Sequence, residues 1–193
     1  AKMIHDFIPV ARAIIGVRYL NVIIFGPRPQ YFLSCNAPIK QLYNFGIEIE
    51  ENSELDLYAA FNEHKDDPRI ESVVKEMEKE LGEGNKMAGI LPKLAQFEIT
   101  LLDWAEGHKG SREYVVFANK CWPSFQTQFG FVPCYVNSRL TAMGIPVACE
   151  VDIYGAVSEY IGMCVSGDAV TLLDINNTVP NDIYKENIEG KFD

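Results

Sequence analysis

The chain has 193 residues, of which 48% are hydrophobic and 23% are charged. This composition is typical of a globular domain, and it argues against disorder or a fibrous repeat. The 27 acidic and 17 basic residues give a net charge of −10. That balance argues against a broad nucleic-acid-binding surface, because phosphate binding depends on clustered Lys and Arg. Cation binding is compatible with it, although a solvated acidic surface is the commoner explanation.

Cysteine usage and hydropathy point to a cytoplasmic protein. The five cysteines, at positions 35, 121, 134, 149 and 164, include no CxxC pair and no pair with zinc-ligand spacing. We therefore expect buried, reduced thiols. No uninterrupted apolar run approaches the roughly 18 residues of a membrane span, and the first 25 residues lack the layout of a signal peptide. Neither a membrane nor a nucleic acid is an expected partner.

Hydrophobic periodicity and turn residues predict an alternation of helices and strands. In chain order, the first predicted elements are a helix over residues 3–20, a strand over 22–25 closed by a Gly-Pro-Arg-Pro turn, a short helix over 38–45, a strand over 46–50, and a helix that begins after Asn52 or Ser53. They are followed by a helix over 67–82, a long helix over 87–106, a strand over 114–117, a helix over 134–143, a strand over 145–149, a helix over 152–165 and a strand over 170–173.

This order predicts an α/β fold with an open parallel sheet of about five strands and helices on both faces, a three-layer arrangement of the Rossmann or flavodoxin type. We expect an N-terminal connecting helix over residues 1–20 and an α/β domain over 21–175. Residues 176–193 would then be a polar tail or the start of a further domain.

Two acidic residues follow two successive predicted strands. Glu150 directly follows the fourth strand, and Asp174, 24 residues later, directly follows the fifth. If these parallel strands are neighbours, about 4.8 Å apart, both carboxylates emerge at one edge of the sheet, where ligands of such folds gather. Two adjacent carboxylates repel each other unless a proton or a divalent cation lies between them. The alternative is that both are solvated loop carboxylates.

Weaker candidates lie in the loops after the first and third strands. Arg28 stands where a ligand-binding loop is expected and could bind an anion or a sugar hydroxyl, although an ordinary surface arginine is the commoner explanation. The segment 121–130 puts Trp122, Gln126 and Gln128 after the third strand. An aromatic face beside amide groups suits a sugar ring, and a core tryptophan with turn-forming neighbours is the alternative.

Several segments resemble the L-fucose isomerase family, which includes related arabinose isomerases. They are CWP at 121–123, CYVNSRL at 134–140 and GIPVACEVDIYGA at 144–156, with less distinctive similarity at 25–28 and 45–47. The spacing from Glu150 to Asp174 is also similar to that between the acidic metal ligands of this family. The resemblance covers roughly positions 20–178.

The resemblance implies a ketol isomerase that uses Mn²⁺ or another divalent cation to interconvert an aldose and a ketose. Glu150 and Asp174 would be both metal ligands and catalytic residues, moving a proton between C1 and C2 through a cis-enediol. Trp122 and either Gln126 or Gln128 would lie near the sugar, and Arg28 in the loop after the first strand stays a candidate substrate residue. The resemblance also implies a small-molecule sugar substrate and a homo-oligomer of the full-length protein.

One departure from the family pattern limits the activity expected of this chain on its own. In the family, a histidine from a later domain completes the metal site, and none of the three histidines here stands at a matching place. We therefore expect the central domain of a longer isomerase, weak in Mn²⁺ binding and inactive as an isolated fragment. Two alternatives remain, namely a non-catalytic sugar-binding or sensor module and another metal-dependent enzyme that acts on a carbohydrate-like substrate.

Overall fold

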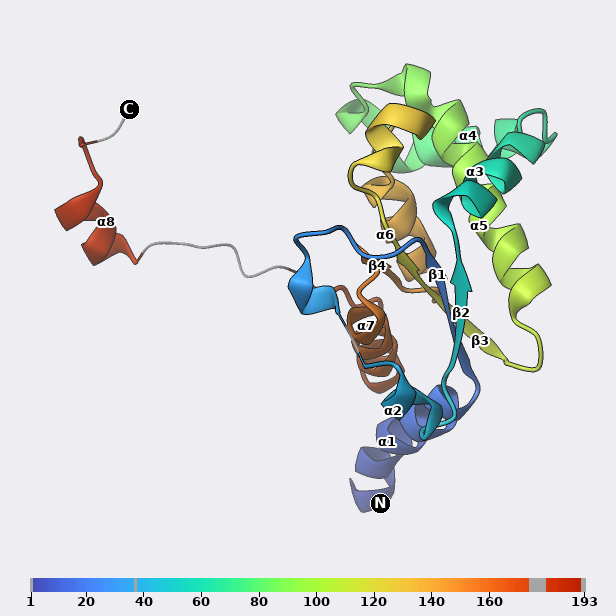
Figure 1. The fold of residues 1–193 in the computed structure, drawn as a ribbon, viewed down its shortest axis with the longest axis vertical. Coiled ribbons are helices and arrows are strands. Elements are labelled where there is room, and N and C mark those ends of the chain that lie inside the picture. The colour runs from blue at the N-terminus through green and yellow to red at the C-terminus, as the bar shows by residue number, and fades with distance from the viewer. Residues whose placement is uncertain (1, 37, 174–179, 192–193) are drawn as a thin grey trace.

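The computed structural model describes residues 2–36, 38–173 and 180–191. Its centre is a sheet of four parallel strands, in the order β2-β1-β3-β4. The strands are Leu20–Phe25 (β1), Glu48–Asn52 (β2), Tyr114–Asn119 (β3) and Val147–Cys149 (β4). Helices cover both faces of the sheet (Figure 1). The predicted three-layer α/β fold class is therefore confirmed.

The first seven helices lie close to their predicted places, whereas the eighth, in the predicted polar tail, was not predicted. They are Lys2–Arg18 (α1), Lys40–Tyr43 (α2), Glu54–Glu63 (α3), Ile70–Leu81 (α4), Leu91–His108 (α5), Cys134–Ala142 (α6), Ile153–Ser166 (α7) and Asn181–Asn187 (α8). Short 3₁₀ turns occur at Leu33–Cys35, Gly82–Gly84 and Ala88–Ile90, and a π-helix (η4) spans Phe125–Phe129.

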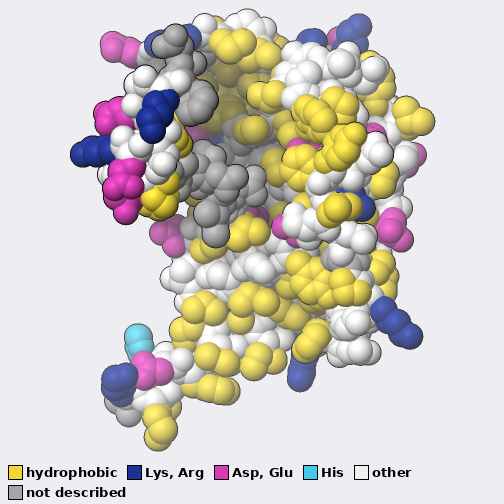
Figure 2. Space-filling view, turned by 60° about the vertical axis from the view of Figure 1, so that its left-hand side comes forward, with side chains coloured by type: hydrophobic (Ala, Val, Ile, Leu, Met, Phe, Trp, Pro, Cys, Tyr) yellow, Lys and Arg dark blue, Asp and Glu magenta, His cyan; other side chains and the backbone are white. Residues whose placement is uncertain are grey.

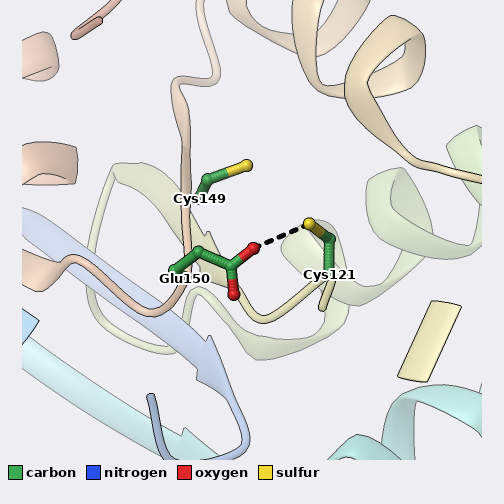
Figure 3. A group of neighbouring side chains, drawn as sticks. All are labelled: Cys121, Cys149 and Glu150. Atoms are coloured by element: carbon green, nitrogen blue, oxygen red, sulfur yellow. Dashed lines mark hydrogen bonds between the residues drawn. The ribbon is translucent and has the colours of Figure 1, made fainter. Parts of the chain in front are cut away.

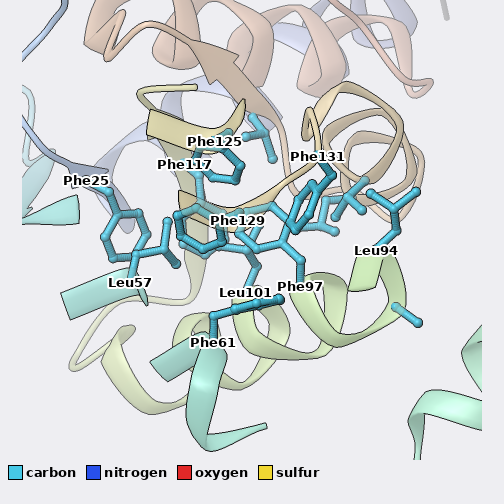
Figure 4. Close-up of a cluster of buried hydrophobic side chains, with 14 of the residues drawn as sticks. Phe25, Leu57, Phe61, Leu94, Phe97, Leu101, Phe117, Phe125, Phe129 and Phe131 are labelled. Atoms are coloured by element: carbon cyan, nitrogen blue, oxygen red, sulfur yellow. The ribbon is translucent and has the colours of Figure 1, made fainter. Parts of the chain in front are cut away.

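One face of the sheet packs against α3, α4, α5 and α6 through a core rich in phenylalanine (Figure 4). Phe97 of α5 is fully buried, and its ring lies 5.2–6.4 Å from the rings of Phe61, Phe125, Phe129 and Phe131. Aromatic pairs at these separations contribute beyond simple burial of apolar area. This core fixes the η4 segment, which follows β3 at the carboxyl edge of the sheet.

A buried ion pair ties α6 to this layer. Arg139 of α6 donates from Nε to Glu98 Oε2 over 2.6 Å and from Nη2 to Glu98 Oε1 over 3.1 Å. Its Nη1 also donates to Glu80 of α4. Glu98 of α5 is only 1% exposed, so its buried charge depends on the guanidinium of Arg139 for compensation.

The other face of the sheet packs against α1, α2 and α7. Alternate residues of β1 divide between the faces, so Val22 and Ile24 contact this layer while Ile23 and Phe25 contact the other. Helix α1 approaches α7 closely at Gly16, where a Cβ atom would lie 2.6 Å from the Tyr160 hydroxyl. The small residue therefore sets how closely the two helices pack.

Most of the apolar stripe predicted for the first helix lies on its outer side. Phe7, Ile8, Ile14 and Ile15 of α1 are each about half exposed or more, and hydrophobic side chains gather on this part of the surface (Figure 2). None of the described helices combines the length and apolar character that a membrane crossing requires. The predicted division into residues 1–20, 21–175 and 176–193 stays a prediction.

The predicted fifth strand over residues 170–173 does not form. This segment has no regular secondary structure, and Thr171, Leu172 and Leu173 are exposed. The Leu172 backbone N–H donates instead to Glu159 Oε1 of α7 over 2.6 Å. Asp174, the predicted second metal ligand, lies outside the described residues.

The order of the strands creates a switch point between β1 and β3. The chain passes from β1 to β2 on one side of β1, and from there to β3 on the other side. At such a point the loops after the two strands separate and leave a crevice at the carboxyl edge, where α/β proteins of this type bind ligands. The loops after β1 and β3 carry Arg28 and Trp122, and the turn after the neighbouring β4 carries Glu150.

Candidate functional site at the carboxyl edge of the sheet

Glu150 is a buried carboxylate at the end of β4. The residue is 7% exposed and adopts a left-handed backbone with φ of 56°, and Val151 follows with φ of 58°. This conformation is unfavourable for residues other than glycine. Glu150 Oε1 accepts a hydrogen bond of 2.7 Å from the Cys121 thiol, and Oε2 has no hydrogen-bond partner among the described residues.

Two thiols surround this carboxylate. The strand register pairs Asn119 of β3 with Cys149 of β4, which brings Cys121, two residues after Asn119, beside the end of β4. The side chains of Cys121, Cys149 and Glu150 point toward one another (Figure 3), and one ligand atom from each lies within 4.8 Å of the others. A hydrogen bond with Cys149, burial and the charge of Glu150 together raise the pKa of the Cys121 thiol.

A second buried polar residue ends β3. Asn119 is fully buried, and neither its Nδ2 nor its Oδ1 atom has a partner within the described part of the chain. Buried polar groups are nearly always hydrogen-bonded, so orphaned atoms on neighbouring strand ends need an explanation, such as a bound ligand or ordered water. Asn119 was not among the predicted site residues, although its place as the first polar residue after the apolar run 115–118 was a usable signal.

A short polar network braces the loop after β3. Glu54, the first residue of α3, accepts from Lys120 Nζ over 3.0 Å and from the Ser124 hydroxyl. This network holds the segment that contains Cys121 and Trp122 against the first turn of α3, which follows β2. Trp122 itself is 47% exposed, and its ring centroid lies 6.5 Å from that of Phe32. An accessible aromatic surface therefore stands next to the Glu150 cluster.

Arg28 lines a cavity of about 760 Å³ at the same edge of the sheet. Its other lining groups include Asn36, Asn52 and Ser53, and Val151 forms part of the wall. The Arg28 Nη1 atom donates to the backbone carbonyls of its own turn, at Pro29 and Gln30, which fixes the side chain against the loop. The cavity is large enough for a small ligand such as a hexose.

The structure does not bring all the predicted site residues together. Gln126 lines a different, largely apolar cavity of about 690 Å³ between α5 and α6, and Gln128 is an exposed residue of η4. Arg28, Trp122 and Glu150 lie on loops at the carboxyl edge, whereas Asp174 falls among the residues that are not described. The roles assigned to these residues stay predictions.

At the end of β4, Glu150 is suited to supply one ligand to a divalent cation. Glu150 offers a buried oxygen atom, Oε2, which no other described group uses. Carboxylate oxygen suits Mn²⁺ and Mg²⁺. The two adjacent thiols, of Cys121 and Cys149, are softer donors. The sequence did not predict them as part of the site, because they lie 28 residues apart and come together only through the pairing of β3 with β4. Of the five thiols, only that of Cys164 is buried, so the expectation of five buried thiols was wrong.

Another acidic cluster is already neutralised by protein groups. His64, Asp67 and Asp103 come within 4.8 Å of one another, but Arg69 donates to both carboxylates. Burial alone would lower the pKa of His64, yet hydrogen bonds with the Ala60 carbonyl and with Asp103 outweigh burial and raise it. These contacts form an ion network that holds α3 to α5. Because its charged groups already have partners within the protein, the Glu150 cluster is the better candidate site.

Comparison with known proteins relates the chain to sugar isomerases. No protein-family model matches the chain. It is 30% identical to a sulfoquinovose isomerase from Alkalicoccus urumqiensis over 179 residues, which cover 84% of this chain and 38% of that protein. It is 29% identical to a sulfoquinovose isomerase from Priestia aryabhattai over 157 residues, 80% of this chain and 34% of that protein. Over 68 residues, 32% of this chain and 15% of the relative, it is 40% identical to a sulfoquinovose isomerase from Clostridium sp. (strain MSTE9).

The two longer matches extend over most of the chain, whereas the chain spans about a third of the length of those relatives. The expected resemblance to isomerases is supported at the level of sugar isomerases in general. The finer expectation of the L-fucose isomerase family stays a prediction, because the names of these relatives do not test it. We conclude that the chain is similar in sequence to proteins named as sugar isomerases.

Proposed function

We propose that this chain is part of an aldose–ketose isomerase that depends on a divalent cation. The observation that carries the proposal is Glu150, a buried carboxylate with one unpartnered oxygen at the carboxyl edge of the sheet, in a chain similar to sulfoquinovose isomerases. Ketol isomerisation requires that one group remove a proton next to a carbonyl and return it to the adjacent carbon. A carboxylate shielded from bulk water is well suited to that transfer.

In this proposal Glu150 contributes one ligand to Mn²⁺ or a similar cation, and Asp174 contributes another. The cation, when bound, would stabilise negative charge on the sugar oxygens O1 and O2. A carboxylate of the pair carries the proton between C1 and C2. The Cys121 thiol, which donates to Glu150 Oε1, holds that carboxylate in place. The proposal also includes a third metal ligand outside this chain and a longer parent protein to which the chain belongs. That protein would be a homo-oligomer in the cytoplasm.

We further propose that the substrate carries an anionic group, as sulfoquinovose carries a sulfonate. The relatives are named for this sugar. Arg28 supports the idea, because it lines the cavity at the same edge of the sheet and its turn fixes its side chain. A guanidinium can donate two parallel hydrogen bonds to a sulfonate, as it does to a carboxylate or phosphate. The exposed ring of Trp122 would cover the C–H face of the sugar.

The catalytic role is tested in the full-length parent protein with Glu150→Gln, which removes the charge and keeps the size of the side chain. Sulfoquinovose and a panel of unsulfonated aldoses are assayed with Mn²⁺, and exchange of the substrate C2 proton is followed in deuterated water. We expect a loss of at least about 100-fold in kcat and in proton exchange. Glu159→Gln, which changes another buried carboxylate outside the cluster, is the matched control.

Each outcome of this experiment has a distinct meaning. Unchanged turnover in Glu150→Gln would refute the proposed role of this residue. Sugar binding by the unaltered protein without any conversion would favour the non-catalytic sugar-binding module instead.

The role of Arg28 is tested by comparing Arg28→Met and Arg28→Lys. A lost charged hydrogen bond weakens binding by about 1.5–3 kcal/mol, so we expect Arg28→Met to raise KM for sulfoquinovose about 10- to 100-fold. The KM for unsulfonated sugars should stay the same, and Arg28→Lys should retain part of the affinity. An equal rise in KM for both classes of sugar would show that Arg28 does not recognise the sulfonate.

A further inference from the structure

The cluster at the end of β4 contains two thiols as well as a carboxylate. The sulfur atoms of Cys121 and Cys149 and an oxygen of Glu150 all lie within 4.8 Å of one another. In a tetrahedral zinc site with bonds of about 2.3 Å, two sulfur ligands are separated by about 3.8 Å. The three side chains therefore need to move by only about an ångström to reach the distances of a metal centre.

The donor chemistry of this cluster differs from that of a Mn²⁺ site. Mn²⁺ and Mg²⁺ prefer oxygen ligands, whereas thiolates select softer cations such as Zn²⁺ and Cd²⁺. Two sulfurs and one carboxylate are a three-ligand set that leaves a fourth position for water. We propose that Cys121, Cys149 and Glu150 bind a thiophilic divalent cation.

Independent features of the structure support this site. The carboxylate of Glu150 is buried, and its Oε2 atom has no hydrogen-bond partner in the described residues. A buried charge is costly unless it is paired or coordinated to a metal. The left-handed backbone of Glu150 also directs its side chain into the cluster, at the expense of local strain. Cys149 is exposed, which gives an ion access from solvent.

Binding replaces the two thiol protons with one metal ion. Each S–H bond breaks, each thiolate forms a bond to the cation, and two protons pass to solvent. No change of oxidation state is involved. Because Glu150 belongs to both donor sets, a thiophilic cation and a catalytic Mn²⁺ would compete for the same carboxylate. This last consequence rests on the proposed function, whereas the binding site does not.

The site is tested by titrating the reduced, metal-free chain with Cd²⁺ and following the ultraviolet charge-transfer absorption of cadmium thiolates. Protection of thiols against a disulfide reagent is measured in parallel. We expect one Cd²⁺ per chain and protection of two of the five cysteines. Cys121→Ser and Cys149→Ser should each weaken Cd²⁺ binding at least tenfold and lower the absorption. Serine at position 121 keeps a hydroxyl that can donate to Glu150.

The matched control is Cys164→Ala, which removes a buried thiol from the opposite layer of the fold. This variant should bind Cd²⁺ as the unaltered chain does, and circular dichroism establishes that every variant is folded. Glu150→Gln should weaken binding while retaining the thiolate absorption. An absorption that persists in the Cys121→Ser/Cys149→Ser double variant, or equal affinity in all single variants, would overturn the proposal. Neither result depends on isomerase activity, so failure here is distinguishable from failure of the proposed function.

Discussion

Replacing Glu150 by glycine should make the chain more stable, although it removes the central residue of the candidate site. Glu150 has a left-handed backbone, with φ of 56°, which costs a residue with a Cβ atom about 1–2 kcal/mol. Removing a buried carboxylate that has one unpartnered oxygen recovers about 1–3 kcal/mol of desolvation. The greater freedom of glycine in the unfolded chain costs about 0.5–1 kcal/mol. The lost hydrogen bond from Cys121 costs about 1 kcal/mol.

The central values of these contributions sum to a gain of about 2 kcal/mol in the free energy of unfolding. Urea denaturation followed by circular dichroism measures it, and equal m-values show that the midpoint reports stability. For a chain of this size, thermal unfolding should shift upward by about 2–4 °C per kcal/mol.

Alanine at the same position separates backbone strain from loss of the carboxylate. Glu150→Ala removes the same side-chain groups but keeps the Cβ atom in the left-handed conformation. We therefore expect Glu150→Gly to be more stable than Glu150→Ala by about 1 kcal/mol, whereas alanine is favoured at most positions. If the alanine variant proves the more stable of the two, the turn after β4 is not strained at Glu150, and the reasoning is refuted.

Three further predictions concern the scaffold. Arg139→Met should lower the free energy of unfolding by about 3–5 kcal/mol, because it leaves the buried carboxylate of Glu98 without its partner. Gly16→Ala should cost about 1–3 kcal/mol, because the added Cβ would overlap the buried ring of Tyr160. Because folding raises the pKa of His64, the protonated imidazole should stabilise the fold fully below pH 6.5, its ordinary pKa. This contribution should disappear as pH rises through the raised pKa.

Each of these predictions has its own control, measured by urea denaturation. The Arg139→Met/Glu98→Leu double variant should recover most of the stability, and a double variant as unstable as the single one would contradict the role of the ion pair. Gly107→Ala, in an open stretch of α5, should instead stabilise by about 0.5–1 kcal/mol. His64→Gln should flatten the pH dependence of stability above pH 6.5, and an unchanged profile would assign that dependence to another group.

The strands that the sequence predicted best are those buried on both faces. Residues 22–25 and 114–117 fall within β1 and β3, because continuous apolar runs bounded by turn residues are a strong signal of central parallel strands. The run at 170–173 carries a similar signal but forms no strand. Its Leu172 N–H donates to the side chain of Glu159, and sequence patterns do not reveal such a competing partner.

The candidate site was predictable in its place but not in its composition. Because Glu150 directly follows an apolar run, its position at the carboxyl edge of the sheet could be predicted. The contribution of Cys121 and Cys149 could not, because their proximity depends on the register that pairs Asn119 with Cys149. Register is a property of the assembled sheet, and no local pattern in the sequence specifies it.

The turn after β4 also explains how neighbouring residues serve one site. In a regular strand, Cys149 and Glu150 would point to opposite faces of the sheet, because side chains alternate along a strand. Their ligand atoms nevertheless lie within 4.8 Å of each other. The left-handed backbone of Glu150 and Val151 interrupts the alternation and returns the carboxylate to the side of the two thiols. A β4 that continued as a regular strand would leave the carboxylate on the face packed against α1 and α7, so the strained turn is what creates the cluster.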